Sequence, residues 1–471
     1  MSSNDVRTLF IVIPYGIGWK TILNEKAVEY LTSKKMKLVI IAESPDVSIN
    51  HPMVSIEKLV PYDRSKLEVM LGILRNYVFA DTSKKHAETL ELKMKIYERQ
   101  NTTARYMRRL FGKKLSRVKV IKSFLAWLDL NLFGDKTYGG LFERYKPDTV
   151  FITYPFSFHV YPFLRRATKQ KIPTIAYVPS WDNLTSKWEV PAKFNKMIVW
   201  NKIMKDEAVE FLDYDEKDVL ICGIPQFDLY ADPLIIIPKK DFLKTVGADP
   251  NKKLLTYATG TPALYKDEAE IVEVIYDAMT DGKIPKPCQL LIRLHPRRDF
   301  QDFARFEGKK DVILQTPGKA SSAFAKSGYF WVSDVADYAT LANTMANSDV
   351  IINVASTITL ESCVVNRPVV NIGFDGRTQR EYHESVRRYF DYTHYRNILK
   401  TGGVRVAWTK EDLVKIVNAY LDDDTLDVEG RKKIVEQQCY RIDGKSLDRM
   451  LEFVADFVDE RTKALIADSD A

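Results

Sequence analysis

Residues 350–361 read Val-Ile-Ile-Asn-Val-Ala-Ser-Thr-Ile-Thr-Leu-Glu. The apolar run Val350–Val354 predicts a buried strand, and the hydroxyl residues that follow it predict the first turn of a helix. An apolar strand that leads directly into a helix is typical of a parallel sheet covered by helices on both faces. This stretch therefore predicts an α/β domain, in which ligands bind just beyond the carboxyl ends of the strands.

The same strand-to-helix pattern occurs in two series along the chain. The first series is predicted at Leu9–Pro14, Leu38–Ala42, Thr149–Thr153, Thr174–Val178, Met197–Trp200 and Val219–Cys222. The second is predicted at Leu254–Ala258, Gln289–Leu294, Val312–Gln315, Val350–Val354 and Pro368–Ile372. Two such series in 471 residues predict two Rossmann-like, doubly wound parallel-sheet domains.

A proline-rich region between Pro225 and Pro250 separates the two series, as a domain connection would. After Trp408 only helical patterns follow. The predicted division is an N-terminal domain at 1–228 with a basic helical insertion around 85–145, a C-terminal domain at 229–440 and a C-terminal helix at 441–471.

The composition is that of a globular protein, with 45% apolar and 28% charged residues. Four scattered cysteines argue against a disulfide framework or a cysteine zinc site and fit a reducing compartment. The apolar run Leu9–Ile13 is too short for a signal peptide, and no uncharged run is long enough to span a bilayer. We therefore expect a cytoplasmic protein, with a peripheral position on the inner face of the membrane as an option.

The formal net charge of +7 is concentrated in one segment. Eight basic residues lie between Arg105 and Lys122, and no acid follows them before Asp129. Apolar residues alternate with them through 105–133, which is typical of an amphipathic helix on an anionic membrane, or of a surface helix packed on the sheet. Nucleic acid could use the same charge, but no RNA- or DNA-binding module accompanies it, so we expect no nucleic-acid partner.

Three predicted strand ends in the C-terminal half carry residues suited to a phosphate. They are Thr259 and Gly260, then Arg293, His295 and Arg297, and then Ser356 and Thr357. Guanidinium groups match phosphate geometry, and free N–H groups at a helix start attract anions. Each loop also has a simpler interpretation, as a helix cap or a solvated basic turn.

An ordered set of motifs spans more than half of the chain, roughly Pro173 to Asp443. The set is Gly223-x-Pro225-Gln226-x-Asp228, Arg293-x-His295-Pro296, Ser356-Thr357 with Glu361, and Gly373-Phe374-Asp375-Gly376. It resembles the C-terminal half of GT-B glycosyltransferases of bacterial and archaeal surface-glycan clusters. It is also similar to the CDP-glycerol glycerophosphotransferases. Thr359-Leu360-Glu361 is similar to the donor signature of UDP-glycosyltransferases, although Asn353 and Ala355 replace its His and Gly.

This resemblance implies an α/β GT-B fold with two Rossmann-like domains facing a cleft, and it assigns roles to residues. Arg293, His295, Arg297 and the Ser356–Thr357 loop would hold the donor diphosphate, together with Thr259 and Gly260. Glu361 would bind the ribose, and Asp375 and Lys187 would bind the transferred sugar.

Two residues are candidates for the catalytic base. Asp182 follows the predicted strand Thr174–Val178, next to Trp181, where partial desolvation would raise the basicity of a carboxylate. The simpler interpretation is an Asp-Asn turn that caps a helix. His159 is the alternative, although a lone histidine in an aromatic run is more often packed.

We therefore expect an enzyme, an inverting and metal-independent GT-B glycosyltransferase. It would move a sugar from a nucleotide-sugar donor to a glycan or lipid-linked acceptor, with no cofactor other than the donor. The alternatives are a CDP-polyol phosphotransferase of the teichoic-acid type and a sugar-nucleotide 2-epimerase.

Overall fold

The computed structural model describes residues 6–14, 22–43, 49–79, 87–102, 105–106, 119–133, 137–187, 190–262, 265, 267–320, 331–332 and 335–469. The chain forms two compact units. Unit 1 comprises Met1–Gln226 and Lys445–Ala471, and unit 2 comprises Phe227–Gly444. The first and last parts of the chain therefore belong to the same unit.

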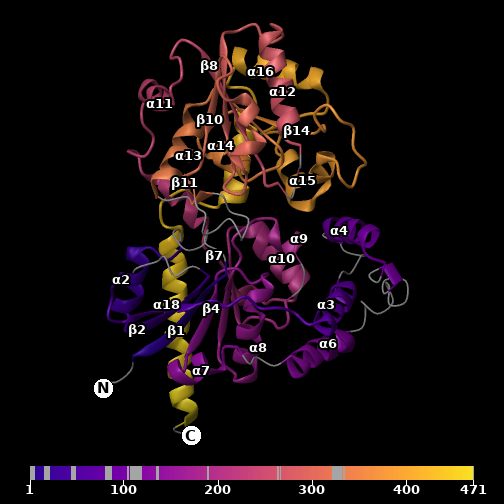
Figure 1. Ribbon diagram of the computed structural model, residues 1–471. Coiled ribbons are helices and arrows are strands. Elements are labelled where there is room, and N and C mark those ends of the chain that lie inside the picture. The colour runs from indigo at the N-terminus through magenta and orange to yellow at the C-terminus, as the bar shows by residue number, and fades with distance from the viewer. Residues whose placement is uncertain are drawn as a thin grey trace. The chain divides into compact units, whose positions relative to one another are not determined.

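Unit 1 contains a parallel seven-stranded sheet in the order β3-β2-β1-β4-β5-β6-β7 (Figure 1). Its strands are β1 Arg7–Ile13, β2 Met36–Ala42, β3 Val54–Lys58, β4 Thr149–Ile152, β5 Thr174–Tyr177, β6 Lys196–Val199 and β7 Val219–Ile221. The strand order reverses between β1 and β4, which pair with Leu9 opposite Thr149. All six predicted strands of this half are confirmed, with ends that differ by one or two residues.

Unit 1 also contains helices. They are α2 Glu25–Ser33, α3 Lys66–Phe79, α4 Ala87–Gln100, α6 Lys119–Leu132, α7 Gly139–Tyr145, α8 Tyr161–Lys169, α9 Asn183–Ser186, α10 Lys202–Leu212 and α18 Ser446–Ser469. Buried side chains of β1 such as Phe10 and Val12 pack with Phe142 of α7 and Phe163 of α8. Burial of these large apolar groups is the main stabilising contribution to the unit.

Helix α18 returns to unit 1 after the chain has passed through unit 2. Arg449 donates from Nε to the carbonyl oxygen of Cys222 at 2.8 Å, and Lys26 of α2 pairs with Asp448 at 2.5 Å. Further along the helix, Asp459 pairs with Arg7 of β1. The helix is thus fixed to unit 1 at several points along its length.

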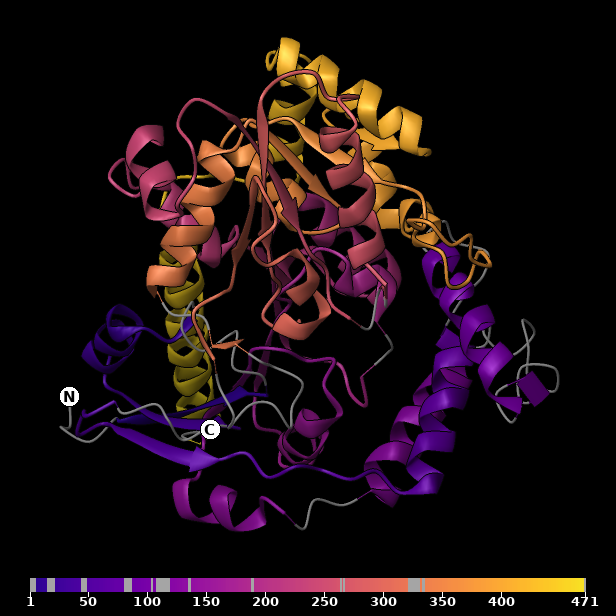
Figure 2. The same ribbon diagram turned by 45° about the horizontal axis from the view of Figure 1, so that its top comes forward.

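Helices α3 and α6 lie side by side in both ribbon views (Figures 1 and 2) and are joined to α8 by a buried charge cluster. Arg165 of α8 pairs with Asp129 of α6 and with Glu68 of α3, each at 2.7 Å. Arg75 of α3 pairs with the other oxygen of Asp129, also at 2.7 Å. All four side chains are almost fully buried, so the cluster fixes this helical layer to the rest of the unit.

Unit 2 contains a parallel six-stranded sheet in the order β10-β9-β8-β13-β14-β15. Its strands are β8 Lys253–Ala258, β9 Cys288–Arg293, β10 Val312–Gln315, β13 Val350–Asn353, β14 Val369–Ile372 and β15 Arg405–Ala407, and a separate antiparallel pair is formed by β11 Lys319–Ala320 and β12 Trp331–Val332. Its helices are α11 Lys239–Thr245, α12 Ala269–Thr280, α13 Val335–Asn347, α14 Ile358–Val364, α15 Thr393–Leu399, α16 Lys410–Asp422 and α17 Val428–Ile434. All five predicted strands of this half are confirmed.

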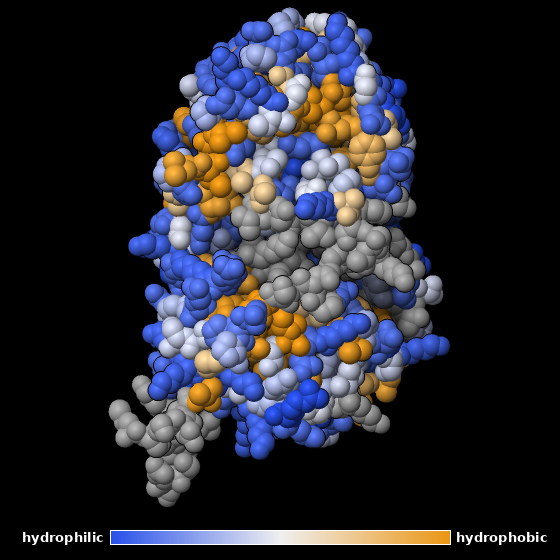
Figure 3. Space-filling view, turned by 60° about the vertical axis from the view of Figure 1, so that its left-hand side comes forward, coloured by the Kyte–Doolittle hydropathy of each residue, from blue (hydrophilic) through white to orange (hydrophobic). Residues whose placement is uncertain are grey.

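On the face shown in Figure 3, hydrophilic residues cover most of the described surface, and hydrophobic residues gather in separate patches among them. This distribution is usual for globular proteins, whose surfaces keep many apolar atoms exposed. Within the described ranges, no helix has both the length and the apolar composition that a bilayer span requires.

Candidate functional site

Four neighbouring strands of unit 2 carry the predicted donor residues at their carboxyl ends. Ala258 of β8 lies opposite Arg293 of β9 on one side and opposite Asn353 of β13 on the other. Asn353 in turn lies opposite Asn371 of β14. The strand order reverses between β8 and β13, and this switch point is where doubly wound sheets bind ligands.

His295 lies at this edge in a defined orientation. Its backbone N–H donates to Oγ1 of Thr259 at 2.9 Å, and its Nδ1 accepts from the backbone N–H of Arg297 at 3.0 Å. Burial, together with the positive charges of Arg297 and Arg298, lowers the pKa of His295 to about 4. The imidazole is therefore neutral at pH 7, and because Nδ1 accepts, the hydrogen is on Nε2, which is a donor.

Thr259 and Gly260 support the His295 loop in the structure. The amide N–H of Gly260 donates to Glu268 at 2.8 Å, so this N–H already has a carboxylate partner. Arg298 is fully buried, donates to the carbonyl oxygen of Gly260 at 3.0 Å and pairs with Glu268 at 2.7 Å. A direct contact of Gly260 with a diphosphate stays a prediction, and the observed contacts give the loop a positioning role.

Arg293 is buried beneath the same loops. Its Nη2 pairs with Asp337 of α13, and its Nη1 donates to the carbonyl oxygen of Thr316 at 3.2 Å. A guanidinium that is already paired offers less to a diphosphate than an unpaired one. The diphosphate role of Arg293 stays a prediction, and Asp337 is a partner that the sequence did not indicate.

Glu361 and the Ser356–Thr357 loop lie at the start of α14. Oγ of Ser356 accepts from the backbone N–H of Ile358 at 3.3 Å, and the side chain of Thr357 forms no capping hydrogen bond. Oε2 of Glu361 accepts from the hydroxyl of Tyr230 at 2.7 Å. Burial raises the pKa of Glu361 to about 7, although the hydrogen bond from Tyr230 and the charge of Arg293 oppose the rise.

A buried polar network beneath these loops was not predicted from the sequence. Tyr395 of α15 donates to Asn371 at 2.9 Å and lies 3.0 Å from the hydroxyl of Thr359. Asn371 donates to Asn353 at 3.2 Å. Asparagine residues inside two apolar strands were the available signal, because buried amides need partners. The network joins β13 and β14 to the two helices that follow them.

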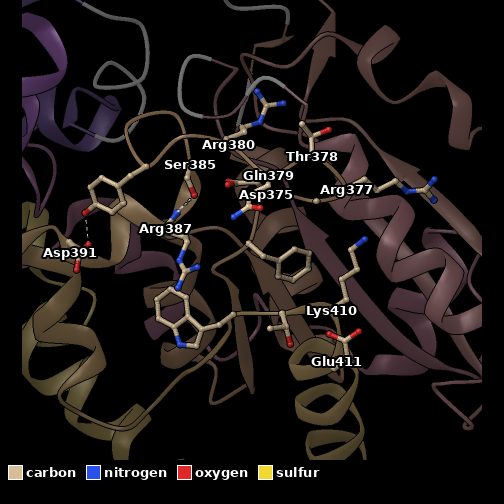
Figure 4. Close-up of a pocket in the computed structure, with 15 residues that line it drawn as sticks. Asp375, Arg377, Thr378, Gln379, Arg380, Ser385, Arg387, Asp391, Lys410 and Glu411 are labelled. Atoms are coloured by element: carbon tan, nitrogen blue, oxygen red, sulfur yellow. Dashed lines mark hydrogen bonds between the residues drawn. The ribbon is translucent and has the colours of Figure 1, made fainter. Parts of the chain in front are cut away.

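Asp375 follows β14 and lines a hollow of about 780 Å³ (Figure 4). The carboxylate is buried, and its Oδ1 accepts from the backbone N–H of Val386 at 2.8 Å. The loops after β14 and β15 form the wall of this hollow, at the same edge of the sheet as the predicted donor residues. A role for Asp375 in binding a sugar stays a prediction.

Asp182 and Lys187 of unit 1 flank the short helix α9, beyond the end of β5. The Asp182 carboxylate accepts from Ser180 Oγ at 2.5 Å, from Ser186 Oγ at 2.6 Å and from the amide of Asn183 at 3.1 Å. Burial raises the pKa of Glu207, on the adjacent α10, well above its ordinary value, and the negative charge of Asp182 adds to the rise. The backbone N–H of Lys187 closes α9 with a hydrogen bond to Asn183 at 2.9 Å.

His159, the alternative base, follows the neighbouring strand β4. Its Nδ1 accepts from the backbone N–H of Tyr62 at 3.0 Å, and its ring packs on Phe158 with centroids 4.1 Å apart. Burial lowers the pKa of His159. In the neutral ring with Nδ1 occupied, the hydrogen is on Nε2, and no lone pair is left to accept a substrate proton. This geometry argues against His159 as the base, and the role of Asp182 stays a prediction.

Only part of the predicted basic segment 105–133 is described. Residues 107–118, with most of its charges, lie outside the described residues, as do the side chains of Lys119 and Lys122. The apolar residues of α6 face two ways. Leu125 packs on Leu71 of α3, whereas Phe124 and Trp127 are 54% and 58% exposed. No group of three or more His, Cys, Asp or Glu side chains is placed to hold a metal in the described ranges.

Comparison with solved structures shows the fold. The S. aureus MnaA–UDP co-structure has a TM-score of 0.54 and 11% identity, covering 96% of this chain and 97% of that one. UDP-GlcNAc 2-epimerase from Neisseria meningitidis bound to UDP-GlcNAc has a TM-score of 0.51 and 13% identity, covering 95% of this chain and 99% of that one. The predicted GT-B class, with two Rossmann-like parallel-sheet units, is confirmed.

Two comparisons of sequence point to transferases. A processive diacylglycerol beta-glucosyltransferase from Bacillus pumilus is 27% identical over 188 residues, which is 39% of this chain. The match spans 45% of that relative, less than half of its length. The family model described as CDP-Glycerol:Poly(glycerophosphate) glycerophosphotransferase matches residues 164–456, which is more than half of the 471 residues. The chain belongs to the CDP-glycerol:poly(glycerophosphate) glycerophosphotransferase family.

Proposed function

We propose that this chain is a GT-B transferase that takes a unit from a nucleotide-activated donor and delivers it to a glycan or lipid-linked acceptor in the synthesis of a surface polysaccharide or glycoconjugate. The observation that carries the proposal is the neutral His295, which is held at the switch point of unit 2 with its Nε2–H as a donor. Family membership adds that the residues after β8, β9 and β13 lie within a transferase region.

The donor diphosphate would lie against these strand ends. His295 would donate from Nε2 to a phosphate oxygen, and the Arg297 side chain and the Ser356–Thr357 loop would provide further contacts. A neutral histidine is suited to this role, because it donates one hydrogen bond without needing a protonation step. Glu361 would accept from the ribose hydroxyls.

The first candidate reaction is glycosyl transfer with inversion and without a metal ion. Asp182 takes the proton of an acceptor hydroxyl, whose oxygen then forms a bond to the anomeric carbon. The bond between that carbon and the diphosphate oxygen breaks, and the electron pair stays on the diphosphate. Hydrogen bonds from His295 to the diphosphate offset the charge that develops there.

The second candidate is transfer of a polyol phosphate from a CDP-activated donor, and the description of the family favours it. A base, for which Asp182 is again the candidate, takes the proton of the acceptor hydroxyl, and the acceptor oxygen forms a bond to the phosphorus that carries the polyol. The bond from that phosphorus to the bridging oxygen breaks, and the electron pair leaves with CMP. The same histidine would serve both reactions, so the released nucleotide distinguishes them. A nucleoside diphosphate indicates glycosyl transfer, and CMP indicates phosphotransfer.

Thermal denaturation of the full chain with UDP, GDP, CDP, CMP and dTDP, each with and without EDTA, tests the donor site. A nucleotide that binds the native state raises the melting temperature by mass action. In His295→Ala we expect Kd for that nucleotide to rise by roughly 10- to 100-fold, because a hydrogen bond to a charged group is lost. His51→Ala in unit 1 is the control, and unchanged nucleotide affinity in His295→Ala would contradict the proposal.

Turnover tests the base separately from binding. Asp182→Asn keeps the size of the side chain but has one acceptor oxygen, so it can accept from only one of the two hydroxyls, Ser180 or Ser186, which donate to different oxygens of Asp182. We expect unchanged nucleotide affinity and loss of turnover with UDP-glucose, UDP-GlcNAc or CDP-glycerol as the donor. Retained turnover in this variant would exclude Asp182 as the base.

We propose that helix α6 binds the surface of an anionic membrane. The Phe124 and Trp127 rings stack 6.0 Å apart on the exposed face of this helix, and amphipathic helices insert such side chains at the lipid interface. The natural protein should sediment with phosphatidylglycerol vesicles, and the double variant Phe124→Ser, Trp127→Ser should stay in the supernatant. Leu234→Ser, which changes an 83% exposed leucine in unit 2, is the control and should stay bound. Equal sedimentation of both variants would exclude this surface.

A further inference from the structure

The hollow at the ends of β14 and β15 has a rim that is fixed to α12. Glu270 accepts from the backbone N–H groups of Arg377 and Thr378, at 3.0 and 3.2 Å. The Arg377 guanidinium pairs with Asp277 at 2.6 Å, and the Arg380 guanidinium pairs with Asp267. Two of the four basic side chains that line the hollow are therefore already neutralised by acids of unit 2.

The other two basic side chains have no such partner. Within the described residues, neither Arg387 nor Lys410 forms an ion pair, and the Arg387 guanidinium instead lies 5.3 Å from the ring centroid of Trp408. In the view of Figure 4, Asp375 lies between Arg387 and Lys410. Two unpaired cations that line one hollow are suited to an anionic group of a ligand.

Trp408 forms a fixed aromatic wall. Its ring makes an edge contact with Phe390 at 5.3 Å, and it lies against Gly373, where an added Cβ would be only 2.5 Å from the indole. The indole is nevertheless 39% exposed and lines the hollow. An indole held in this way offers an apolar face to the C–H groups of a ring or polyol, and its rigidity limits the entropy lost on binding.

Carboxylates complete the lining. Asp375 is nine-tenths buried, and only its Oδ1 has a hydrogen-bond partner within the described residues, so Oδ2 can accept from a ligand hydroxyl. Glu411, on the first turn of α16, offers a second acceptor at the rim. The volume of about 780 Å³ is in the range of small-ligand sites and exceeds what a lone phosphate needs.

We infer that this hollow is a binding site for a hydroxylated unit that carries one anionic group, either a phosphorylated or carboxylated sugar or a polyol phosphate. Arg387 and Lys410 bind the anion, Trp408 covers the carbon skeleton and Asp375 binds a hydroxyl. The inference deepens the proposed function, on which it rests for the source of the ligand. That source is either the unit carried by the donor or a unit of the acceptor chain.

Calorimetric titration of the full chain with nucleotide-free probes tests the site. Glycerol 3-phosphate and glucuronate are the anionic probes, glycerol and glucose are their neutral counterparts, and inorganic phosphate is the probe without a carbon skeleton. We expect binding of the two anionic probes, with Kd at least tenfold lower than for the neutral compounds or phosphate. Equal affinity for a probe and its neutral counterpart, or for phosphate alone, would overturn the inference.

The double variant Arg387→Gln, Lys410→Gln should weaken binding of the anionic probes at least tenfold. Arg377→Gln is the matched control, because the Arg377 guanidinium lines the same hollow but is already paired with Asp277. This variant should change Kd for the anionic probes less than threefold. Equal effects in the two variants would contradict the assignment. Because no probe contains a nucleotide, failure here leaves the donor site intact, and His295→Ala tests that site independently.

Kinetics distinguish the two sources once a donor is known. A raised KM for the donor alone in the double variant places the ligand on the donated unit, and a raised KM for the acceptor alone places it on the acceptor. Unchanged KM for both substrates would overturn the inference even if the probes bind.

Discussion

Replacing Glu361 by Gln should change how the stability of unit 2 depends on pH. Burial raises the pKa of this carboxyl to about 7, whereas the same group in the unfolded chain has a pKa near 4.5. The folded state therefore holds a proton that the unfolded state has lost between these two values. The protonated carboxyl therefore makes its full contribution to the free energy of unfolding below pH 4.5, and this contribution is lost as the pH rises through about 7.

The size of the effect follows from the two pKa values. A difference of about 2.5 pKa units corresponds to about 3 kcal/mol, and most of it is lost between pH 5 and pH 8. Glu361→Gln keeps an acceptor for the Tyr230 hydroxyl and does not titrate. The variant should match the natural protein at pH 5 and should exceed its unfolding free energy by roughly 2–3 kcal/mol at pH 8.

Urea denaturation at half-unit intervals from pH 5 to pH 8 measures this difference. Glu384→Gln, at an exposed carboxylate of the same unit, is the control and should follow the natural protein at every pH. Tyr230→Phe removes a hydrogen bond that favours the ionised form, so its loss of stability should move to higher pH. Parallel curves for the natural protein and Glu361→Gln across the whole range would show that Glu361 has no raised pKa.

Three further predictions concern stability and the hollow. Asp129→Asn should lower the free energy of unfolding by about 3 kcal/mol in urea denaturation, because it removes the buried negative charge that pairs with both Arg165 and Arg75; a loss below 1 kcal/mol would contradict this. Glu207→Gln should raise the melting temperature relative to the natural protein by an amount that grows from pH 5 to pH 8, since burial raises the pKa of Glu207, and a constant difference would refute the cause. Gly373→Ala should displace the indole of Trp408, lower stability by about 1–3 kcal/mol and weaken calorimetric binding of glycerol 3-phosphate, whereas unchanged binding would show that the indole position is not needed.

Most of the strands that the sequence predicts are buried on both faces; β7 and β10 are the exceptions. Runs such as Leu254–Ala258 and Val350–Val354 are mostly apolar, because both faces of these strands are buried, and such runs are visible in the sequence alone. Two of the four edge strands, β3 and β15, were not predicted, whereas the edge strands β7 and β10 were. The sequences of β3 (Val-Ser-Ile-Glu-Lys) and β15 (Arg-Val-Ala) mix polar with apolar residues, so neither contains the apolar run on which the prediction depends.

The predicted donor residues follow four strands that proved to be neighbours, since parallel topology brings strand ends to one edge. What the sequence could not provide is which of these side chains are already bound within the protein. Arg293 and Arg298 are equivalent in the sequence to any basic residue near a turn. Their carboxylate partners, Asp337 and Glu268, lie 44 and 30 residues away, and only the tertiary structure identifies them.

The return of α18 to unit 1 has a consequence for the order in which the protein is synthesised. Unit 2 is one continuous segment, Phe227–Gly444, and can complete its fold on the ribosome while the last helix is still in the exit tunnel. Unit 1 cannot, because the contacts of Arg449 with Cys222 and of Asp459 with Arg7 form only after translation has passed residue 459. The part of the chain that is made first is therefore the part that finishes folding last.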